Sequence, residues 1–411
     1  MAKNSFLKEA MTENHPQYEK AIQRKEPLYQ RENDLRSPFS RDYNRIIFSL
    51  AYRRLKHKTQ VFFAVEDDHV CTRSEHVNLV DSVSYTIANY LGLNTELTRS
   101  IAVGHDLGHA PFGHGGEKII NTLCKENDLP AFWHEKNSLY FVDEIDTLED
   151  NHHIRRNLNL TYAIRDGIIS HCGEMNQKSI QKRNEYIDLK DYQYPGQYNP
   201  YTWEGCVVKM SDKIAYLARD IEDALRLNII DEKQVEQLKK EINMISSYHF
   251  DAINNGTIVN YFILDVCQNS SLEKGICLSD EAFEVMKKMM SFNYKNIYNH
   301  EKANDAKTCY SDIFYTRRQG WLMPGSVEAI FRGPSADYNG SNWNMTKLWG
   351  PKVAGLVAHD KIIHLPTANL VKMYGMANGL PVDDPNSGFD ERYPFKDRDP
   401  RFYHDIVFDG F

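Results

Sequence analysis

The chain has 411 residues and a formal net charge of −8, with 41% hydrophobic and 26% charged residues. These proportions are ordinary for a globular protein, and no segment approaches the roughly 20 apolar residues of a membrane-spanning helix. The negative balance does not indicate a nucleic-acid partner, although a small anionic substrate needs only a local group of cations. The first residues, MAKNSFLKEAMTENH, lack the apolar core of a secretion signal, so we expect a cytoplasmic protein without membrane contact.

Helices dominate the predicted secondary structure. A helix over residues 40–55 opens on a Ser-x-Asp start signal and carries apolar side chains at helical spacing. Residues 58–73 have β-favouring runs on either side of an acidic turn, which predicts a short hairpin. A long helix over residues 75–91 is predicted to stop at Gly92, and a further helix is expected over residues 231–245.

The predicted helix over residues 207–225 has two different faces. Asp212, Tyr216 and Asp220 lie within about 80° of one another on the helical wheel, with Lys213 just beyond. The apolar side chains gather on another face. A solvated face with ion pairs is one interpretation of the polar side, but an aromatic ring between two aspartates favours a ligand pocket.

The segment HDLGHAPFGHGGE, residues 105–117, combines three histidines and two carboxylates with Gly and Pro residues that bend the backbone. His105 and Asp106 offer the mixed nitrogen and oxygen ligands that suit a divalent metal ion. The bends allow His109 and His114 to return toward that ion. A His-Asp pair alone is weak evidence, because it occurs three times in this chain and is often a capping or surface pair.

Two further donors complete a four-ligand site. His76 stands at a predicted helix start in TRSEH, and Asp212 lies on the polar face described above. Taken alone, His76 fits a hydrogen-bonded core or surface histidine better than a metal ligand. Together with His105 and Asp106, it predicts a His-His-Asp-Asp metal centre.

Several motifs in a fixed order carry a family resemblance. They are SRDYNRIIFSLAYRRLKHKTQVF, TRSEH, GHDLGHAPFGHGGE, GIISHCGE and SDKIAYLARDIEDAL. In this order they resemble the HD-domain deoxynucleoside triphosphate triphosphohydrolases, which include the bacterial dGTPases, over about residues 25–320. The resemblance implies an all-α HD-domain helical bundle, here with one short β-hairpin. It also implies hydrolysis of a dNTP to deoxynucleoside and inorganic triphosphate with a divalent metal ion, Mg, Mn, Fe, Co or Zn.

The resemblance also implies a role for individual residues. The metal ligands would be His76, His105, Asp106 and Asp212. The catalytic residues would be His114, which protonates the departing 5′ oxygen, and Glu117, which orients the ring of His114. The triphosphate would be contacted by Arg73, His109, His134 and Lys213. The deoxyribose would be contacted by Gln60, Tyr216 and Asp220.

The C-terminal segment differs from the rest of the chain. Residues 321–411 hold eight of the 15 prolines and three of the five tryptophans, which predicts an irregular module separate from residues 1–320. Parts of it are similar to a fragment of SusD/RagB-type outer-membrane glycan-binding proteins. The resemblance of residues 25–320 implies an enzyme with a dNTP substrate, and also a dNTP activator and homo-oligomers, because family members commonly have them. The alternatives are another HD-type nucleotidase or phosphodiesterase, or a non-catalytic nucleotide-binding fusion protein.

Overall fold

The computed structural model describes residues 3–28, 33–62, 69–150, 153–171, 177–300, 337–338, 341–342, 374–390 and 396–399. The chain divides into two compact units, Met1–Ala306 and Lys307–Phe411. The boundary expected at residue 320 and most of the SusD-like segment lie outside the described residues, so both stay predictions.

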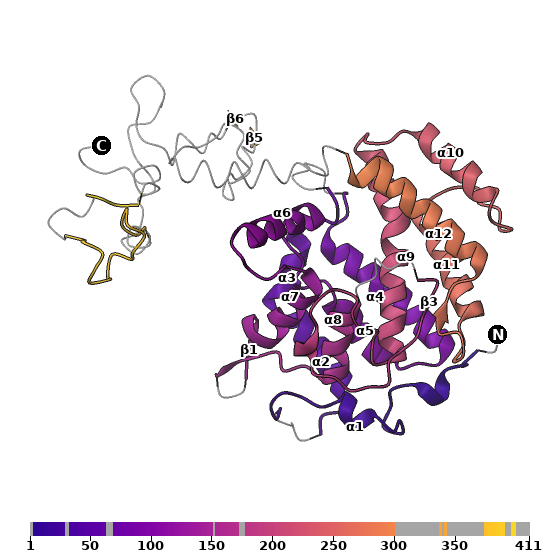
Figure 1. Cartoon of the computed structure of the whole chain (residues 1–411), viewed down its shortest axis with the longest axis horizontal. Coiled ribbons are helices and arrows are strands. Elements are labelled where there is room, and N and C mark those ends of the chain that lie inside the picture. Colours follow the sequence, from indigo (N-terminus) through magenta and orange to yellow (C-terminus); the bar gives the residue numbers. More distant parts are fainter. Residues whose placement is uncertain are drawn as a thin grey trace. The chain divides into compact units, whose positions relative to one another are not determined.

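The first unit is helical, as expected (Figure 1). Its helices are α1 (Tyr18–Ala21), α2 (Pro38–Phe48), α3 (Leu50–Arg54), α4 (Arg73–Leu91), α5 (Thr95–Gly104), α6 (Gly113–Glu126), α7 (His134–Tyr140), α8 (Tyr162–Ser170), α9 (Trp203–Arg226), α10 (Glu232–Asn243), α11 (Asn255–Asn269) and α12 (Asp280–Asn293). Short helical turns are η1 (Leu7–Glu9), η2 (Leu55–His57), η3 (Phe141–Ile145), η4 (Leu189–Asp191) and η5 (Tyr294–Tyr298).

Strands are few and short. The described strands form antiparallel pairs: β1 (Thr147–Glu149) with β2 (Arg155–Asn157), and β3 (Ser179–Ile180) with β4 (Ile276–Cys277). In the second unit, β5 (Asp337–Tyr338) pairs with β6 (Ser341–Asn342). No helix among the described residues has both the length and the apolar character needed to cross a bilayer.

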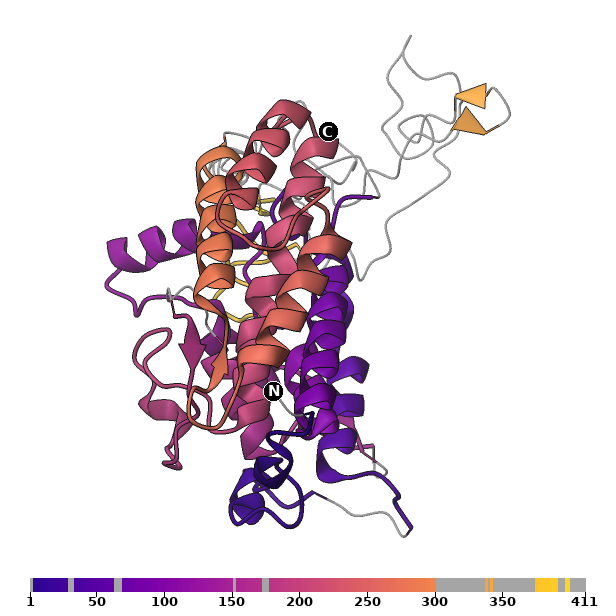
Figure 2. The ribbon, with the colours of Figure 1, turned by 90° about the vertical axis from the view of Figure 1, so that its right-hand side faces the viewer.

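Helix α9 lies at the centre of the first unit (Figure 1), with α11 and α12 alongside it (Figure 2). One hydrophobic core packs α9 and α4 against α10, α11 and α12, with Val83 and Leu217 among its buried residues. The other packs the same two helices against α2, α5 and α8, with Val77 and Ala215 among its buried residues. Since α4 and α9 pack against both cores, apolar packing on two sides fixes the positions of the helices that carry the polar side chains.

Two of the predicted helices, over residues 75–91 and 231–245, are confirmed to within two residues at each end. The Thr72 side chain caps α4 and, with Glu75, forms a reciprocal capping box, while Gly92 ends the helix in the left-handed region at φ 83°. Helix α10 follows an aspartate cap and ends two residues before the expected position, with Leu238 and Ile242 buried. Local capping signals in the sequence were therefore sufficient to place these elements.

The single helix expected over residues 40–55 is wrong, because the structure contains two. Ser37, rather than Ser40, caps α2 by accepting a hydrogen bond from the Ser40 amide at 3.1 Å. Ser49 then leaves the helical conformation, with φ −67° and ψ 154°, and caps α3 by accepting from the Tyr52 amide at 3.1 Å. A serine hydroxyl competes with the helical backbone for hydrogen bonds, which explains the break.

The hairpin expected over residues 58–73 is present in part. Thr59 and Thr72 form an antiparallel bridge, but neither arm is a regular strand. Its acidic turn, residues 66–68, lies outside the described residues. The bridge holds the segment before the turn against the start of α4.

Helices α5 and α8 approach closely because each presents a glycine to an isoleucine of the other. A Cβ atom added to Gly104 would lie 2.8 Å from Cδ1 of Ile168, and one added to Gly167 would lie 2.6 Å from Cδ1 of Ile101. This reciprocal contact brings together the residues that end the two helices. As a result, the rings of His105 and His171 are in edge-to-face contact, with centroids 4.9 Å apart.

We expect Gly167→Ala to destabilise the protein by about 1–3 kcal/mol. The new methyl would meet three side-chain atoms of Ile101 at 2.6–2.7 Å, and Ile101 is fully buried. Urea denaturation measures the effect. Gly256→Ala is the control, because its Cβ would meet only Asn254 Oδ1 at 3.6 Å. Equal free energies of unfolding for the two variants would contradict the close-packing explanation.

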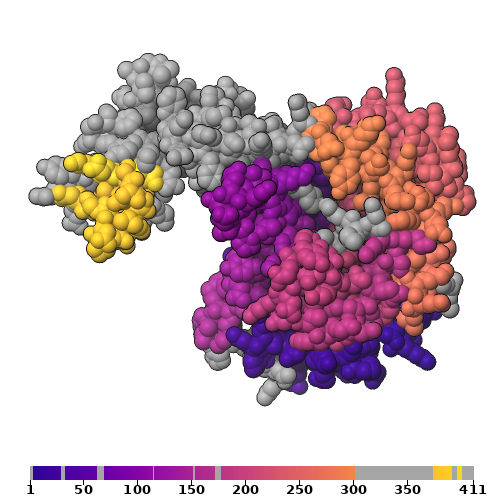
Figure 3. All heavy atoms as spheres, in the orientation of Figure 1, coloured from indigo at the N-terminus to yellow at the C-terminus, as the bar shows by residue number. Residues whose placement is uncertain are grey.

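Glu204 joins the N-terminal segment to the helical core. Its side chain is fully buried, and Oε1 accepts hydrogen bonds from the backbone amides of Met11 at 2.9 Å and Asn94 at 3.0 Å. The N-terminal residues thereby remain attached along one edge of the first unit (Figure 3). Burial raises the pKa of Glu204 from 4.5 to about 6.

This raised pKa predicts a pH dependence of stability. Because the folded-state pKa lies above the unfolded one, the stability contributed by Glu204 is full below about pH 4.5 and is lost as pH rises through about 6. The loss is about 2 kcal/mol. Glu204→Gln keeps an acceptor but cannot ionise, so its free energy of unfolding relative to wild type should rise by that amount between pH 4 and 7.5.

Urea denaturation across this pH range tests the prediction. The exposed Glu13, changed to Gln, is the control from the same N-terminal segment. A constant difference between Glu204→Gln and wild type at every pH would show that the Glu204 carboxyl does not titrate with folding.

Candidate metal centre

Three helices bring His76, His105 and Asp212 together. His76 Nε2 lies 2.9 Å from Asp212 Oδ1, and His105 Nε2 lies 3.7 Å from the same oxygen. One ligand atom from each of the three residues lies within 4.8 Å of the others. His76 comes from α4, His105 ends α5 and Asp212 lies on α9, so residues far apart in the chain meet as the sequence predicts.

The histidine geometry fits a divalent metal ion. His105 Nδ1–H donates to the carbonyl oxygen of Ala102 at 2.6 Å, which leaves the lone pair on Nε2. That Nε2 atom is buried without a hydrogen-bond partner among the described residues. Metal-binding histidines commonly donate their second ring N–H to a carbonyl in this way. Burial lowers the pKa of His105 to about 4, so the ring is neutral and can bind a metal ion at neutral pH.

The Asp212 carboxylate is half-buried and ionised. Burial by itself raises the pKa of Asp212, but the hydrogen bond with His76 and the neighbouring imidazoles hold that pKa well below its ordinary value. The centre therefore offers two nitrogen atoms and a negatively charged oxygen. This donor set suits Zn²⁺ and other divalent transition metals.

Asp106, the fourth predicted ligand, has a different partner in this structure. Its Oδ2 accepts a hydrogen bond from Arg73 Nη1 at 2.8 Å, and both side chains are buried. Burial raises the pKa of Asp106, but Arg73 and the neighbouring histidines together offset this and hold the pKa well below its ordinary value. The structure thus brings three of the four predicted ligands into one group, and coordination by Asp106 stays a prediction.

The loop between α5 and α6 is held by side chains of α7. Ser138 is fully buried, and its hydroxyl accepts from the Gly108 amide and donates to the His105 carbonyl, both at 2.9 Å. Asn137 Nδ2 donates to the Gly108 carbonyl at 2.6 Å. A Cβ atom on Gly108 would lie 2.1 Å from the Ser138 backbone nitrogen, so only glycine fits there.

Lys58 holds the same loop from the other side. Its Nζ donates to the carbonyl oxygen of His109 at 2.6 Å and lies 3.5 Å from that of Leu107. Burial lowers the pKa of Lys58 to about 8. Lys58 was not among the predicted site residues, because a cation that binds main-chain oxygens leaves no recognisable pairing in the sequence.

The chain then reverses direction before α6. Phe112 at φ 62° and Gly113 at φ 59° both adopt the left-handed conformation. A bulky residue in this region is rare, and such positions concentrate at functional sites. The reversal places His114 in the first turn of α6; its side chain lies outside the described part of the structure.

A second group of polar side chains surrounds His134. Its Nδ1 lies 3.1 Å from Glu117 Oε2, and its ring lies 4.6 Å from that of His109 between centroids. Burial lowers the pKa of His134, but Glu135 and Glu117 raise it to about 9. Glu117 was expected to orient His114, and the contact described for it is with His134.

The remaining predicted residues lie on α9 or just before α4. Lys213 and Asp220 are buried, while Tyr216 is half-buried. Asp220 Oδ2 accepts a hydrogen bond from the hydroxyl of Tyr298, and its Oδ1 is buried without a partner among the described residues. Oε1 of Gln60 is likewise buried without a hydrogen-bond partner among the described residues. Burial raises the pKa of Asp220 to about 7.

Several residues that contribute to this region were not predicted, among them Lys58, Glu135, Ser138, His171 and Tyr298. His171 belongs to the quoted motif GIISHCGE, and its place directly after a helix matches that of His105. That repeated position was the one signal that could have identified it. Tyr298 lies in η5, far along the chain from its partner Asp220.

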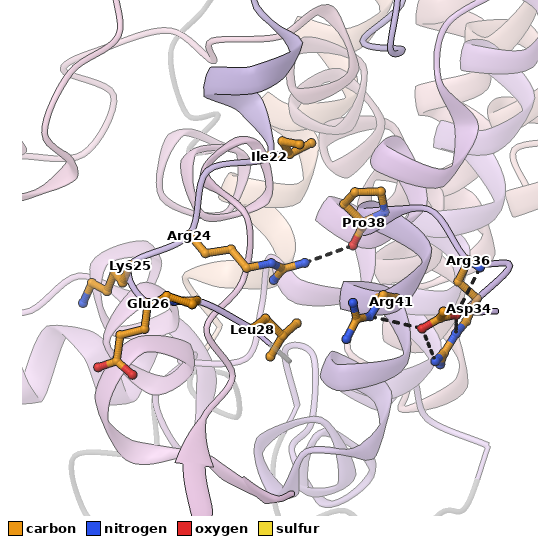
Figure 4. Close-up of a pocket in the computed structure, with 10 residues that line it drawn as sticks. Ile22, Arg24, Lys25, Glu26, Leu28, Asp34, Arg36, Pro38 and Arg41 are labelled. Atoms are coloured by element: carbon orange, nitrogen blue, oxygen red, sulfur yellow. Dashed lines mark hydrogen bonds and ion pairs between the residues drawn. The ribbon is translucent and has the colours of Figure 1, made fainter. Parts of the chain in front are cut away.

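A separate cavity of about 710 Å³ lies elsewhere in the first unit (Figure 4). Arg36 and Arg41 both contact Asp34, at 2.8 and 3.4 Å, and Arg24 contacts Asp42 at 2.7 Å. These guanidinium groups already have carboxylate partners. None of the predicted site residues lines this cavity, and we assign it no ligand.

Ser138→Ala should destabilise the protein by about 1–3 kcal/mol, because it leaves the buried Gly108 amide and His105 carbonyl without partners. It should also weaken metal binding, since the segment that carries His105 loses an anchor. Urea denaturation and metal titration measure the two effects. Ser247→Ala, at an exposed serine, is the control. Unchanged stability and metal affinity would show that Ser138 does not hold the loop.

A family model and curated relatives match this chain. The HD domain model matches residues 73–217, which include all four predicted metal ligands. A deoxyguanosinetriphosphate triphosphohydrolase-like protein of Caldanaerobacter subterraneus is 36% identical over 287 residues, covering 69% of this chain and 72% of the relative. A protein of the same name from Clostridium tetani is 33% identical over 325 residues, covering 76% and 83%. The chain therefore belongs to the HD-domain family of deoxyguanosinetriphosphate triphosphohydrolase-like proteins and is a phosphohydrolase.

Proposed function

We propose that this protein hydrolyses deoxynucleoside triphosphates to deoxynucleoside and inorganic triphosphate with the help of a divalent metal ion. The observation that supports this most is the pairing of metal-ligand and cationic side chains on two packed helices. Helix α4 carries Arg73 and His76, and α9 carries Asp212 and Lys213. A polyanionic substrate needs this combination, and the relatives named above carry a matching activity in their names.

His76, His105 and Asp212, with Asp106, would hold the metal ion. When bound, such an ion acidifies water and neutralises phosphate charge. Mg, Mn, Fe, Co and Zn all accept imidazole and carboxylate ligands.

His114 would supply the proton for the departing 5′ oxygen. An alkoxide is a poor leaving group, so protonation by a nearby histidine favours cleavage at the α-phosphorus. Glu117, one helical turn later on α6, would orient the ring of His114. In this structure the Glu117 carboxylate contacts the ring of His134.

The triphosphate would be bound by Arg73, Lys213, His109 and His134. Arg73 Nε is a buried donor without a partner among the described residues, so the guanidinium retains a site for a phosphate oxygen. Lys213 would add a point charge from α9. The raised pKa of His134, about 9, keeps this ring positively charged at neutral pH, which favours a phosphate oxygen beside it.

Gln60, Tyr216 and Asp220 would read the deoxyribose. Oε1 of Gln60 and Oδ1 of Asp220 are buried acceptors that a sugar hydroxyl could satisfy. The ring of Tyr216 would occupy the space beside C2′ and exclude a ribonucleotide. An unpaired buried acceptor costs free energy, so a substrate that donates to it gains affinity over one that cannot.

The deciding experiment is incubation of the full chain with each of the four dNTPs and with GTP, with Mn²⁺ or Mg²⁺ present. Release of deoxynucleoside and tripolyphosphate, with GTP much slower, supports the proposal. Release of orthophosphate or pyrophosphate would instead indicate another HD-type nucleotidase or phosphodiesterase. No product from any nucleotide by metal-loaded protein would contradict catalysis and favour a nucleotide-binding role.

His114→Ala should retain the metal ion and lose about 100-fold or more of the turnover, because general acid catalysis contributes that much. Asp212→Ala should lose both the metal ion and turnover. Metal analysis and tripolyphosphate release measure the two properties. The control is His249→Ala, whose side chain is 77% exposed. Full activity of His114→Ala would remove this residue from the mechanism.

A further inference from the structure

Asp223 on α9 holds a segment of chain that lies outside the helix. Its Oδ2 accepts a hydrogen bond from the backbone amide of Cys71 at 3.0 Å, and both residues are buried. The carbonyl oxygen of Cys71 in turn accepts from the backbone amide of Gln60 at 3.1 Å. Asp223 is therefore linked, through one intervening residue, to Gln60, which is among the residues proposed to contact the deoxyribose.

This link replaces part of a regular strand pairing. Residues directly opposite in a hydrogen-bonded antiparallel pair exchange two backbone bonds. Gln60 and Cys71 make one of them. The Cys71 amide donates to Asp223 instead. The Gln60 carbonyl accepts from Arg73 Nη2 at 3.1 Å. The backbone of Gln60 is thus held from α9 through Asp223 and from α4 through Arg73.

Asp223 also lies on the face of α9 that bears the other residues proposed to contact the sugar. At 100° per residue, it lies within about 60° of both Tyr216 and Asp220 on the helical wheel. Gln60 Oε1 and Asp220 Oδ1 are buried acceptors without a hydrogen-bond partner among the described residues. A sugar hydroxyl can reach these groups together only if the Gln60 segment keeps its position along α9, and the bond between Asp223 and Cys71 fixes that position.

We propose that Asp223 is a positioning residue for sugar recognition and acts by holding Gln60 in place relative to α9. This inference rests on the proposed hydrolysis of deoxynucleoside triphosphates. Asp223 itself would not touch the substrate, and the metal ligand Asp212 lies about 16 Å away along the axis of α9. Loss of the Asp223 carboxylate should therefore weaken recognition of the sugar while the metal ion is retained.

The test compares two substrates with the full-length, metal-loaded protein. One is the dNTP that is hydrolysed fastest, and the other is its 2′,3′-dideoxy counterpart, which lacks the 3′-hydroxyl. Asp223→Ala and Asp223→Leu both remove the acceptor, and two variants are used so that a folding defect in one leaves the other informative. In each, the ratio of kcat/KM between the two substrates should fall by about fivefold or more, the effect of one lost hydrogen bond. Asp223→Asn keeps an acceptor oxygen and should hold the ratio within about twofold of wild type.

A double variant tests the route through Gln60. If Asp223 acts by positioning Gln60, adding Asp223→Ala to Gln60→Ala should leave the ratio at the value of Gln60→Ala alone. Metal analysis of each variant should give the wild-type content. Losses that multiply in the double variant would contradict the link between the two residues.

Glu222→Ala is the matched control. Glu222 precedes Asp223 on α9 and also binds a backbone amide, that of Asn255, at 2.7 Å. This amide belongs to the start of α11, which carries none of the predicted site residues. The control should keep the wild-type ratio.

An unchanged ratio in Asp223→Ala or Asp223→Leu, an equal fall in Glu222→Ala, or a fall in Asp223→Asn as large as in Asp223→Ala would overturn the inference and leave the proposed hydrolase activity intact. Wild-type protein that hydrolyses no dNTP would instead overturn the proposed function, and this inference with it.

Discussion

The reciprocal contact of glycine and isoleucine between α5 and α8 determines how the histidines of this protein meet. Gly104 faces Ile168 and Gly167 faces Ile101, with no room for a Cβ atom at either glycine. The two helices therefore end side by side, and each ends in a histidine whose Nδ1–H binds a carbonyl of its own last turn. The direction of each Nε2 is thus determined by helix packing, before any ligand is present.

The same principle applies to the charged groups. Arg73 is held by Asp106, His76 by Asp212, and Lys58 by the carbonyls of the loop that follows α5. Each of these bonds joins elements that are distant in the chain. Because these groups are already oriented, little reorganisation free energy is needed when charge develops near them. Helices α4 and α9, which carry Arg73, His76 and Asp212, are packed on both sides by apolar cores.

Sequence patterns predicted those parts of the structure that rest on local chemistry. Thr72, Glu75 and Gly92 determine the ends of α4 through capping alone, and the two faces of α9 follow from helical periodicity. The meeting of His76, His105 and Asp212 was predicted from ligand chemistry and family motifs. Contacts of side chains with the backbone were not predicted. Ser138 and Lys58 bind main-chain oxygen atoms, which every residue has, so the sequence does not reveal the partner. The helix break at Ser49 was also not predicted, because a serine can lie within a helix or cap the next one.

The ligand pair His76 and Asp212 is separated by 136 residues, and it closes only when α4 and α9 are docked. Contacts of such long sequence separation form late, because the chain entropy of closing the loop is lost before the contact returns any free energy. During refolding, capture of a metal ion would therefore follow assembly of both apolar cores. Uptake of the ion can serve as a kinetic marker for the last step in the maturation of the helical unit.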